Sequence, residues 1–142
     1  MIRSYTLGAD TKKDRDLYAW IGHFLMDAAL HEQIGMPITG HAEDRWHVAT
    51  PEKGKARGFT SLRAGKSGQQ FHMRYAYADT SMLRRALITR AIEDARESGA
   101  AMIFTNERHD DADLPALGFK IVSTRQGSFA RWELKLNSGD GK

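Results

Sequence analysis

The sequence predicts a single α+β domain built on a mixed, mostly antiparallel sheet with helices packed against it. The chain has 142 residues, which is enough for one compact domain. Short segments of period two alternate along it with longer segments of helical period. Apolar residues make up 41% and charged residues 27%, as in ordinary globular folds. We therefore expect one domain over residues 1–136 and a flexible polar tail over 137–142.

The chain begins with a predicted strand and a long helix. Residues 2–7 alternate weakly between polar and apolar side chains, as a strand with one buried face does. Asp10 or Thr11 then provides a cap for the following helix. Over residues 14–33, apolar side chains recur at spacings of three and four, which predicts one helical face. Gly35 ends this pattern.

A three-stranded antiparallel meander is expected next. The strands are predicted from alternating side chains at 46–50, 58–64 and 70–78. Polar segments rich in glycine or containing proline separate them, at 51–55 and 65–68, and such residues are typical of turns. Because the connections are short, neighbouring strands should pair directly.

The remaining elements are a helix, a strand, a short helix and two strands. Ser81 provides an N-cap for a helix over 81–97, whose apolar residues share one face. Residues 101–104 form a short apolar strand, and the polar residues 106–111 are expected to form a loop. A short helix is expected over 113–117. The last strands are expected at 120–124 and 128–136.

Composition and charge narrow the classes of function. The absence of cysteine excludes thiolate metal sites and cysteine nucleophiles. A net charge of +3 favours anionic partners such as cofactor phosphates or nucleic acid. It is too small to establish nucleic-acid binding, which usually shows a concentrated basic stripe. There is no apolar run of about 18 residues and no signal-peptide core. We expect a cytoplasmic protein without a membrane segment.

The sequence does not predict a metal site. The six histidines lack the paired spacing of a helical zinc site. His109 lies close to Asp110, Asp111 and Asp113, but the spacing does not match that of a calcium loop. A solvated acidic loop that caps the short helix accounts for these residues instead.

The region 81–119 resembles the core of the GCN5-related N-acyltransferases, the GNAT superfamily, and the order of elements is similar over nearly the whole chain. Leu117-Gly118-Phe119 is similar to the junction where the family's short helix turns into the penultimate strand. Arg85-Ala86-Leu87-Ile88 is similar to its first full turn after the cofactor loop. The resemblance implies transfer of an acetyl group from acetyl-coenzyme A to an amine of a small molecule or protein.

The resemblance also implies where the cofactor binds. In the family, the strand equivalent to 70–78 pairs with the pantetheine arm, and the next helix start holds the diphosphate. The implied cofactor-binding residues are Tyr75, Ala76, Tyr77, Ser81, Met82, Leu83, Arg84, Arg85 and Asn106. The loop 79–85 departs from the family because it has no glycine, and side chains there crowd a phosphate. Arg84 and Arg85 lie unfavourably at the positive helix end, which either a bound anion or solvent exposure would explain.

The catalytic groups implied by the resemblance are incomplete. The family's tyrosine, a general acid on the short helix, is replaced by Leu114, which has no proton to donate. An attacking amine still needs a base. Candidates near the expected cleft are Asp79, Tyr77 and His72, and a buried aromatic or satisfied polar role is the alternative for each.

Two other functions remain open at this point. The missing glycines and tyrosine favour a catalytically inactive GNAT-like protein used in assembly or binding, such as a phage virion-associated protein. The basic balance favours a nucleic-acid-modifying phage relative, which would act in the host cytoplasm. A homodimer is a further expectation for the chain.

Overall fold

The computed structural model describes residues 1–124 and 127–136, and these form seven strands and four helices. The strands are β1 (Ile2–Thr6), β2 (Arg45–Ala49), β3 (Gly58–Ala64), β4 (Gln70–Ala78), β5 (Met102–Arg108), β6 (Lys120–Thr124) and β7 (Phe129–Lys135). The helices are α1 (Thr11–Leu25), α2 (Ala28–Ile34), α3 (Ser81–Glu97) and α4 (Asp113–Ala116). The predicted tail, 137–142, lies outside the described residues.

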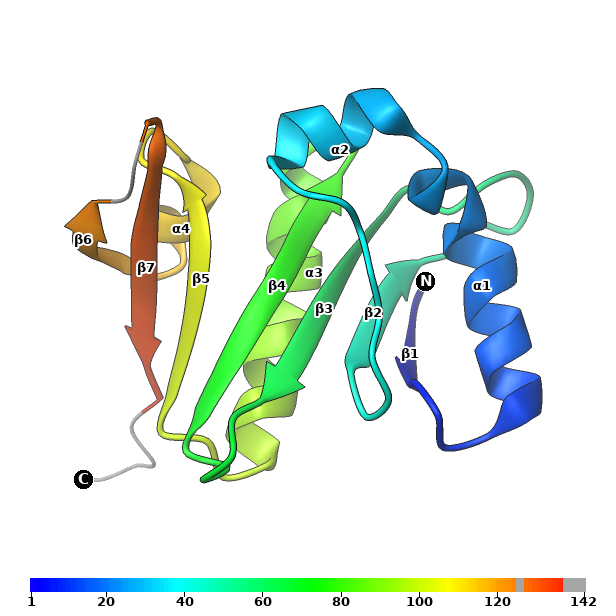
Figure 1. The fold of residues 1–142 in the computed structure, drawn as a ribbon, viewed down its shortest axis with the longest axis horizontal. Coiled ribbons are helices and arrows are strands. Elements are labelled where there is room, and N and C mark those ends of the chain that lie inside the picture. The colour runs from blue at the N-terminus through cyan, green and yellow to red at the C-terminus, as the bar shows by residue number, and fades with distance from the viewer. Residues whose placement is uncertain (125–126, 137–142) are drawn as a thin grey trace.

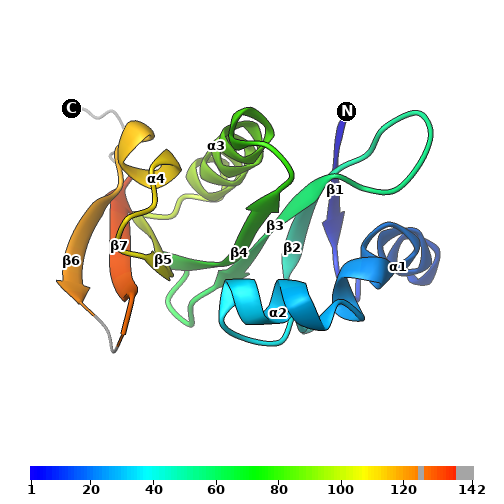
Figure 2. The same ribbon diagram turned by 90° about the horizontal axis from the view of Figure 1, so that it is seen from above.

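All strands belong to one mixed sheet, in the order β1-β2-β3-β4-β5-β7-β6. Neighbours are antiparallel except for β4 and β5, which are parallel because α3 crosses between them. Helices α1 and α2 cover one face of the sheet, and α3 and α4 lie on the other (Figures 1 and 2). The predicted α+β fold with a mixed, mostly antiparallel sheet is confirmed.

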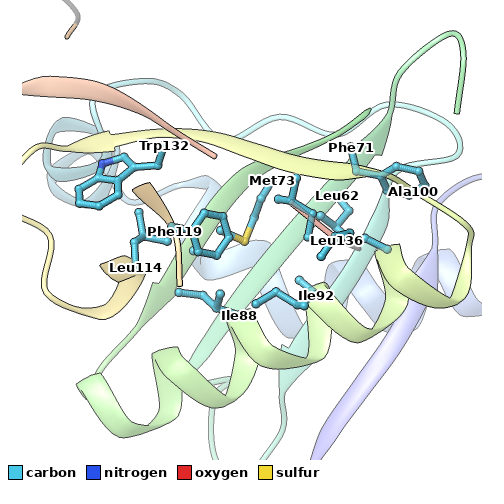
Figure 3. Packing of buried hydrophobic residues seen from close by; sticks show 14 of the residues in the cluster. Leu62, Phe71, Met73, Ile88, Ile92, Ala100, Leu114, Phe119, Trp132 and Leu136 are labelled. Carbon is cyan, nitrogen blue, oxygen red and sulfur yellow. The ribbon is translucent and has the colours of Figure 1, made fainter. Parts of the chain in front are cut away.

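Each face of the sheet has its own hydrophobic core. Ile88, Ala91 and Ala95 on α3 are fully buried, and their cluster also contains Phe119 and Trp132 (Figure 3). The second cluster lies under α1 and α2. Its larger members are Leu17, Ile21, Phe24, Trp46, Phe59 and Tyr75. Burial of one such side chain contributes roughly 1.5–3 kcal/mol, so the two cores hold the helices firmly on the sheet.

Helix boundaries differ from the sequence prediction in two places. The helix expected over 14–33 is two helices, because the Asp27 side chain accepts a hydrogen bond from Leu30 N–H at 3.0 Å and starts α2. The N-cap of α3 is Thr80, whose hydroxyl accepts from Leu83 N–H, and not Ser81. The expectation that Asp10 or Thr11 caps the first helix is confirmed for Asp10.

Strand β5 is longer than the sequence predicts. Residues 106–108 were expected in a loop, but they pair with β7, with Asn106 opposite Arg131 and Glu107 opposite Ala130. Pairing with a distant strand therefore outweighs the polar character of these residues. This extension brings Glu107 into the sheet.

Strands β4 and β5 separate after a short paired region. Their pairing is described for only three residue pairs, from Gln70–Met102 to His72–Phe104. Beyond these, the strands diverge and leave an open V (Figure 1). The β3–β4 register shifts where Tyr75 faces Ser61, so Arg74 is the extra residue of a β-bulge in β4. Because a bulge bends its strand and increases twist, it helps to turn β4 away from β5.

Candidate functional site

The candidate site is a cavity of about 230 Å³ in the gap between β4 and β5. The end of α2 and the start of α3 close its two sides. Its lining residues are Gln33, Ile34, Ala76, Tyr77, Ala78, Arg84, Glu107, Arg108 and Asp111. Other cavities, of about 400 and 420 Å³, lie beside Asp44 and along β6, away from the gap.

Arg84 reaches from α3 into this gap and is held there by four hydrogen-bonded groups. Its Nε donates to the Ala76 carbonyl oxygen at 2.7 Å, and Nη2 donates to Glu107 at 3.2 Å. Its Nη1 donates to Asp111 at 2.6 Å and Asp113 at 2.9 Å. Burial alone would lower the pKa of Arg84, but these carboxylates raise it. The guanidinium is therefore charged, and four of its five N–H donors are in use.

Asp113 places a carboxylate at the start of α3. It accepts hydrogen bonds from the Ser81 hydroxyl and from Arg85 Nε, the latter at 2.8 Å, in addition to the contact with Arg84. Burial alone would raise its pKa, but these hydrogen bonds hold the pKa of Asp113 below its ordinary value. The acid is ionised at neutral pH, and its side chain is only 9% exposed.

The sequence left two explanations for Arg84 and Arg85 at a helix start, namely a bound anion or exposure to solvent. An anion does neutralise the first turn of α3, but it is a carboxylate of the same chain. The prediction of a solvated acidic loop is wrong for Asp111 and Asp113, because both are mostly buried and pair with Arg84. The expectation that this loop caps the short helix is confirmed for Asp111, which accepts a hydrogen bond from Leu114 N–H. Favourable charge at the positive helix end explains why the cluster forms here.

Glu107 has the properties of a proton acceptor in the cavity. It follows Ile103 and Thr105 on the same face of β5, and it lines the gap beside Arg84. Burial raises the pKa of Glu107 above its ordinary value, although the charge of Arg84 acts in the opposite direction. A carboxylate with a raised pKa is a better base at neutral pH than an ordinary one. Sequence reasoning missed this residue because it was placed in a loop.

Three of the expected cofactor residues line the cavity: Ala76, Tyr77 and Arg84. Tyr75 does not, because its ring is fully buried in the core under α1 and α2. Its hydroxyl donates to the Pro37 carbonyl oxygen at 3.0 Å.

The other expected cofactor residues lie around the gap. Ser81 and Arg85 bind Asp113, as described above. Met82 is 82% exposed at the start of α3, and Leu83 is half-buried. Asn106 lies on β5, where its Oδ1 is buried without a hydrogen-bond partner among the described residues.

Of the three expected catalytic residues, the structure brings only Tyr77 to the cavity. Asp79 is exposed and binds Arg57 through two hydrogen bonds, of 2.9 and 3.0 Å. His72 lies where β4 and β5 still pair, with its ring stacked on Phe104 at a centroid distance of 4.5 Å. Neither of these two side chains lines the gap.

His72 is expected to weaken the fold at acid pH. Burial, together with the charges of Arg74, Arg63 and Arg131, lowers its pKa from 6.5 to about 4. The folded state then binds fewer protons than the unfolded state between these pH values, so stability falls as pH falls through this range. Protonation of His72 should therefore cost the wild type on the order of 2 kcal/mol of unfolding free energy, after allowance for the partly exposed ring. His72→Gln should not show this loss.

Urea unfolding of wild type and His72→Gln at pH 7 and pH 4.5 measures this effect. The variant should lose less stability on acidification than the wild type. An equal loss in both proteins would show that His72 does not titrate in this way.

Two other kinds of feature are absent from the described residues. No group of three histidine, aspartate or glutamate side chains there is arranged to hold a metal ion. No helix in that part of the chain combines the length and apolarity needed to cross a membrane.

Comparison with known proteins identifies similar folds. No protein-family model matches the sequence, and no curated protein matches it. The structure of TofI in an apo form matches with a TM-score of 0.71 and 13% identity, covering 96% of this chain and 91% of that one. The aminoglycoside 6'-N-acetyltransferase from Enterococcus faecium matches with a TM-score of 0.63 and 11% identity, covering 96% and 97%.

A third match is shorter. Nourseothricin acetyltransferase aligns with a TM-score of 0.55 and 19% identity, over 66% of this chain and 65% of that protein. The chain thus covers slightly less than two thirds of that protein's length. At these identities the likeness shows a shared fold.

Proposed function

We propose that this chain, which has the fold of the GNAT acetyltransferases, transfers an acyl group from a thioester to an amine in the gap between β4 and β5. The observation that carries the proposal is the cavity there, which brings Glu107 and Tyr77 together between diverging strands. Other structures of this fold support it. The structure of yncA from Salmonella typhimurium contains acetyl-coenzyme A, and N-acetylglutamate synthase from Neisseria gonorrhoeae was solved with coenzyme A.

The proposed reaction needs one proton acceptor and one proton donor. The amine nitrogen attacks the thioester carbonyl carbon, a C–N bond forms, and the C–S bond breaks. Glu107 accepts the proton that the amine loses, because its raised pKa suits that role. Tyr77 lines the same cavity and supplies the proton that the leaving thiolate takes up.

The gap between β4 and β5 suits the thioester end of acetyl-coenzyme A, whereas the start of α3 does not suit its diphosphate. The gap between β4 and β5 has room for a thioester beside Glu107 and Tyr77. The start of α3, where the family binds the diphosphate, has no glycine and holds the ionised Asp113. Such a carboxylate repels a diphosphate, so that half does not fit. The roles above therefore concern the thioester alone.

Release of free thiol from a thioester donor tests this function. The chain has no cysteine, so a thiol reagent detects only the thiol that the donor releases. S-acetylpantetheine and acetyl-coenzyme A are supplied separately, each with an aminoglycoside, a polyamine and a short peptide. Thiol release that depends on both chain and amine is expected. No release with either donor and any amine would disprove the proposal.

The position of Arg84 favours one alternative. Its bond to the Ala76 carbonyl oxygen occupies a backbone group that faces the gap, and an arginine so bound partly fills the space. A binding or assembly protein that keeps the fold without acyl transfer would have such a filled gap. Failure of thiol release with an intact fold would favour this alternative.

A further inference from the structure

Asp113 occupies the anion position at the start of α3 and is held there from two directions. From α3, the Ser81 hydroxyl and the side chains of Arg84 and Arg85 donate to its carboxylate. Asp113 is also the first residue of α4, and the next residue, Leu114, is completely buried in the core. Because Leu114 anchors α4 in the core, the backbone of Asp113 is fixed beside the start of α3.

The neighbouring backbone is fixed as well. Leu114 N–H donates to the Asp111 carboxylate at 2.9 Å, and Asp111 in turn binds Arg84 at 2.6 Å. The two acids, Asp111 and Asp113, therefore form one rigid unit with the first turn of α3. Within it, the side chains of Arg84, Asp111 and Asp113 are mostly buried, whereas that of Arg85 is 45% exposed.

The positive charges of this unit are already paired with carboxylates, so they offer a phosphate little attraction. Arg84 and Arg85 are the cations at the start of α3, and both already bind Asp113. Asp111 and Glu107 add further acidic groups around Arg84. A diphosphate brought to this helix end would meet a fixed carboxylate and two arginines that are already paired. Like charges in such contact oppose binding strongly.

We propose that the acyl donor of this chain is a pantetheine-type thioester without a nucleoside diphosphate, and that Asp113 excludes the diphosphate from the start of α3. The inference rests on the proposed function and defines the donor class for it. The thioester end enters the cavity between β4 and β5, while selectivity arises at the helix end beside it. Exclusion of this kind is a common source of specificity.

A comparison of two donors decides this proposal. S-acetylpantetheine and acetyl-coenzyme A carry the same reacting thioester and differ in the nucleotide diphosphate. In wild type, kcat/KM for acetyl-coenzyme A should be no more than about threefold that for S-acetylpantetheine, because diphosphate contacts contribute nothing. Isothermal titration with pantetheine and coenzyme A gives a second readout that does not depend on turnover, and coenzyme A should bind no more tightly.

Asp113→Asn tests the role of the carboxylate. The substitution removes the charge and keeps the size, so the ratio of kcat/KM values should shift toward acetyl-coenzyme A by about tenfold or more. Asp110→Asn is the matched control, since Asp110 is exposed on the same loop and its loss changes the net charge equally. It should leave the ratio unchanged.

The outcomes separate the inference from the proposed function. A wild-type preference for acetyl-coenzyme A of more than about threefold overturns the inference and leaves acyl transfer standing. An unchanged ratio in Asp113→Asn, in a variant with a normal thermal melt, overturns the role of Asp113. No thiol release with either donor overturns both proposals. The comparison of the two donors in the wild type does not depend on the folding of any variant, so it can overturn the inference by itself.

Discussion

Glu107→Gln is expected to lower kcat for acyl transfer by on the order of 10²–10⁴-fold, because an amide cannot accept the proton of the attacking amine. In the wild type, kcat/KM should rise with pH as Glu107 loses its proton. Burial raises the pKa of this carboxyl, so the midpoint should lie above the ordinary value of 4.5. The variant should lack this rise. Thiol release measured from pH 4 to 9 gives both results.

Two controls separate lost chemistry from a damaged fold. Glu93→Gln makes the same change on the exposed side of α3 and should retain full activity. Thermal unfolding provides the second control. The folded state holds the Glu107 proton more tightly than the unfolded state does, so stability falls as pH rises through the range above 4.5. Glu107→Gln should therefore be at least as stable as wild type at neutral pH. Full activity in this variant would rule out the proposed base.

Much of the fold could be predicted because its signals are local. Alternation over 58–64 and 70–78 predicted β3 and β4 with the bounds that the structure shows. Gly118, expected at a helix end, has a φ of 98°, which a glycine adopts without strain. Turn residues and periodicity act within a few positions of one another, so a single sequence is sufficient to recognise them.

The errors fall where distant partners decide the structure. The extension of β5 to Arg108 depends on pairing with β7, which local polarity does not reveal. For this reason, the sequence-based prediction assigned Glu107 to a loop. Its period of two with Ile103 and Thr105 was a usable signal, since it continues the buried face of the strand.

Three of the residues expected around a cofactor line the candidate cavity, but the chemistry of the site could not be predicted. The unfavourable position of Arg84 and Arg85 at the start of a helix indicated a nearby anion. The sequence could not show that Asp113 supplies it, because this acid follows the arginines by 28 or 29 positions and reaches them only through the fold. Asp79 and His72 were candidates because they lie at the end of β4 and on it, but Asp79 pairs with Arg57 and the His72 ring stacks on Phe104.

Arg63→Ala is expected to destabilise the fold by about 3 kcal/mol, because it leaves a buried carboxylate without its counter-charge. Asp44 is 1% exposed, and Arg63 donates two hydrogen bonds to it, of 2.8 and 2.9 Å. Burial would raise the pKa of Asp44, but these bonds and the His41 N–H lower it. The acid is thus ionised at neutral pH, and urea unfolding at pH 7 measures the loss.

The pair of Arg57 and Asp79 provides a matched control for this prediction. It has the same two-bond geometry, at 2.9 and 3.0 Å, but both side chains are nearly half exposed. Water replaces the lost partner there, so Arg57→Ala should leave the unfolding midpoint almost unchanged. Similar losses in the two variants would show that burial of Asp44 does not set the cost. A much larger loss for Arg63→Ala would assign that cost to the buried charge, since hydrogen-bond number and geometry are alike in both pairs.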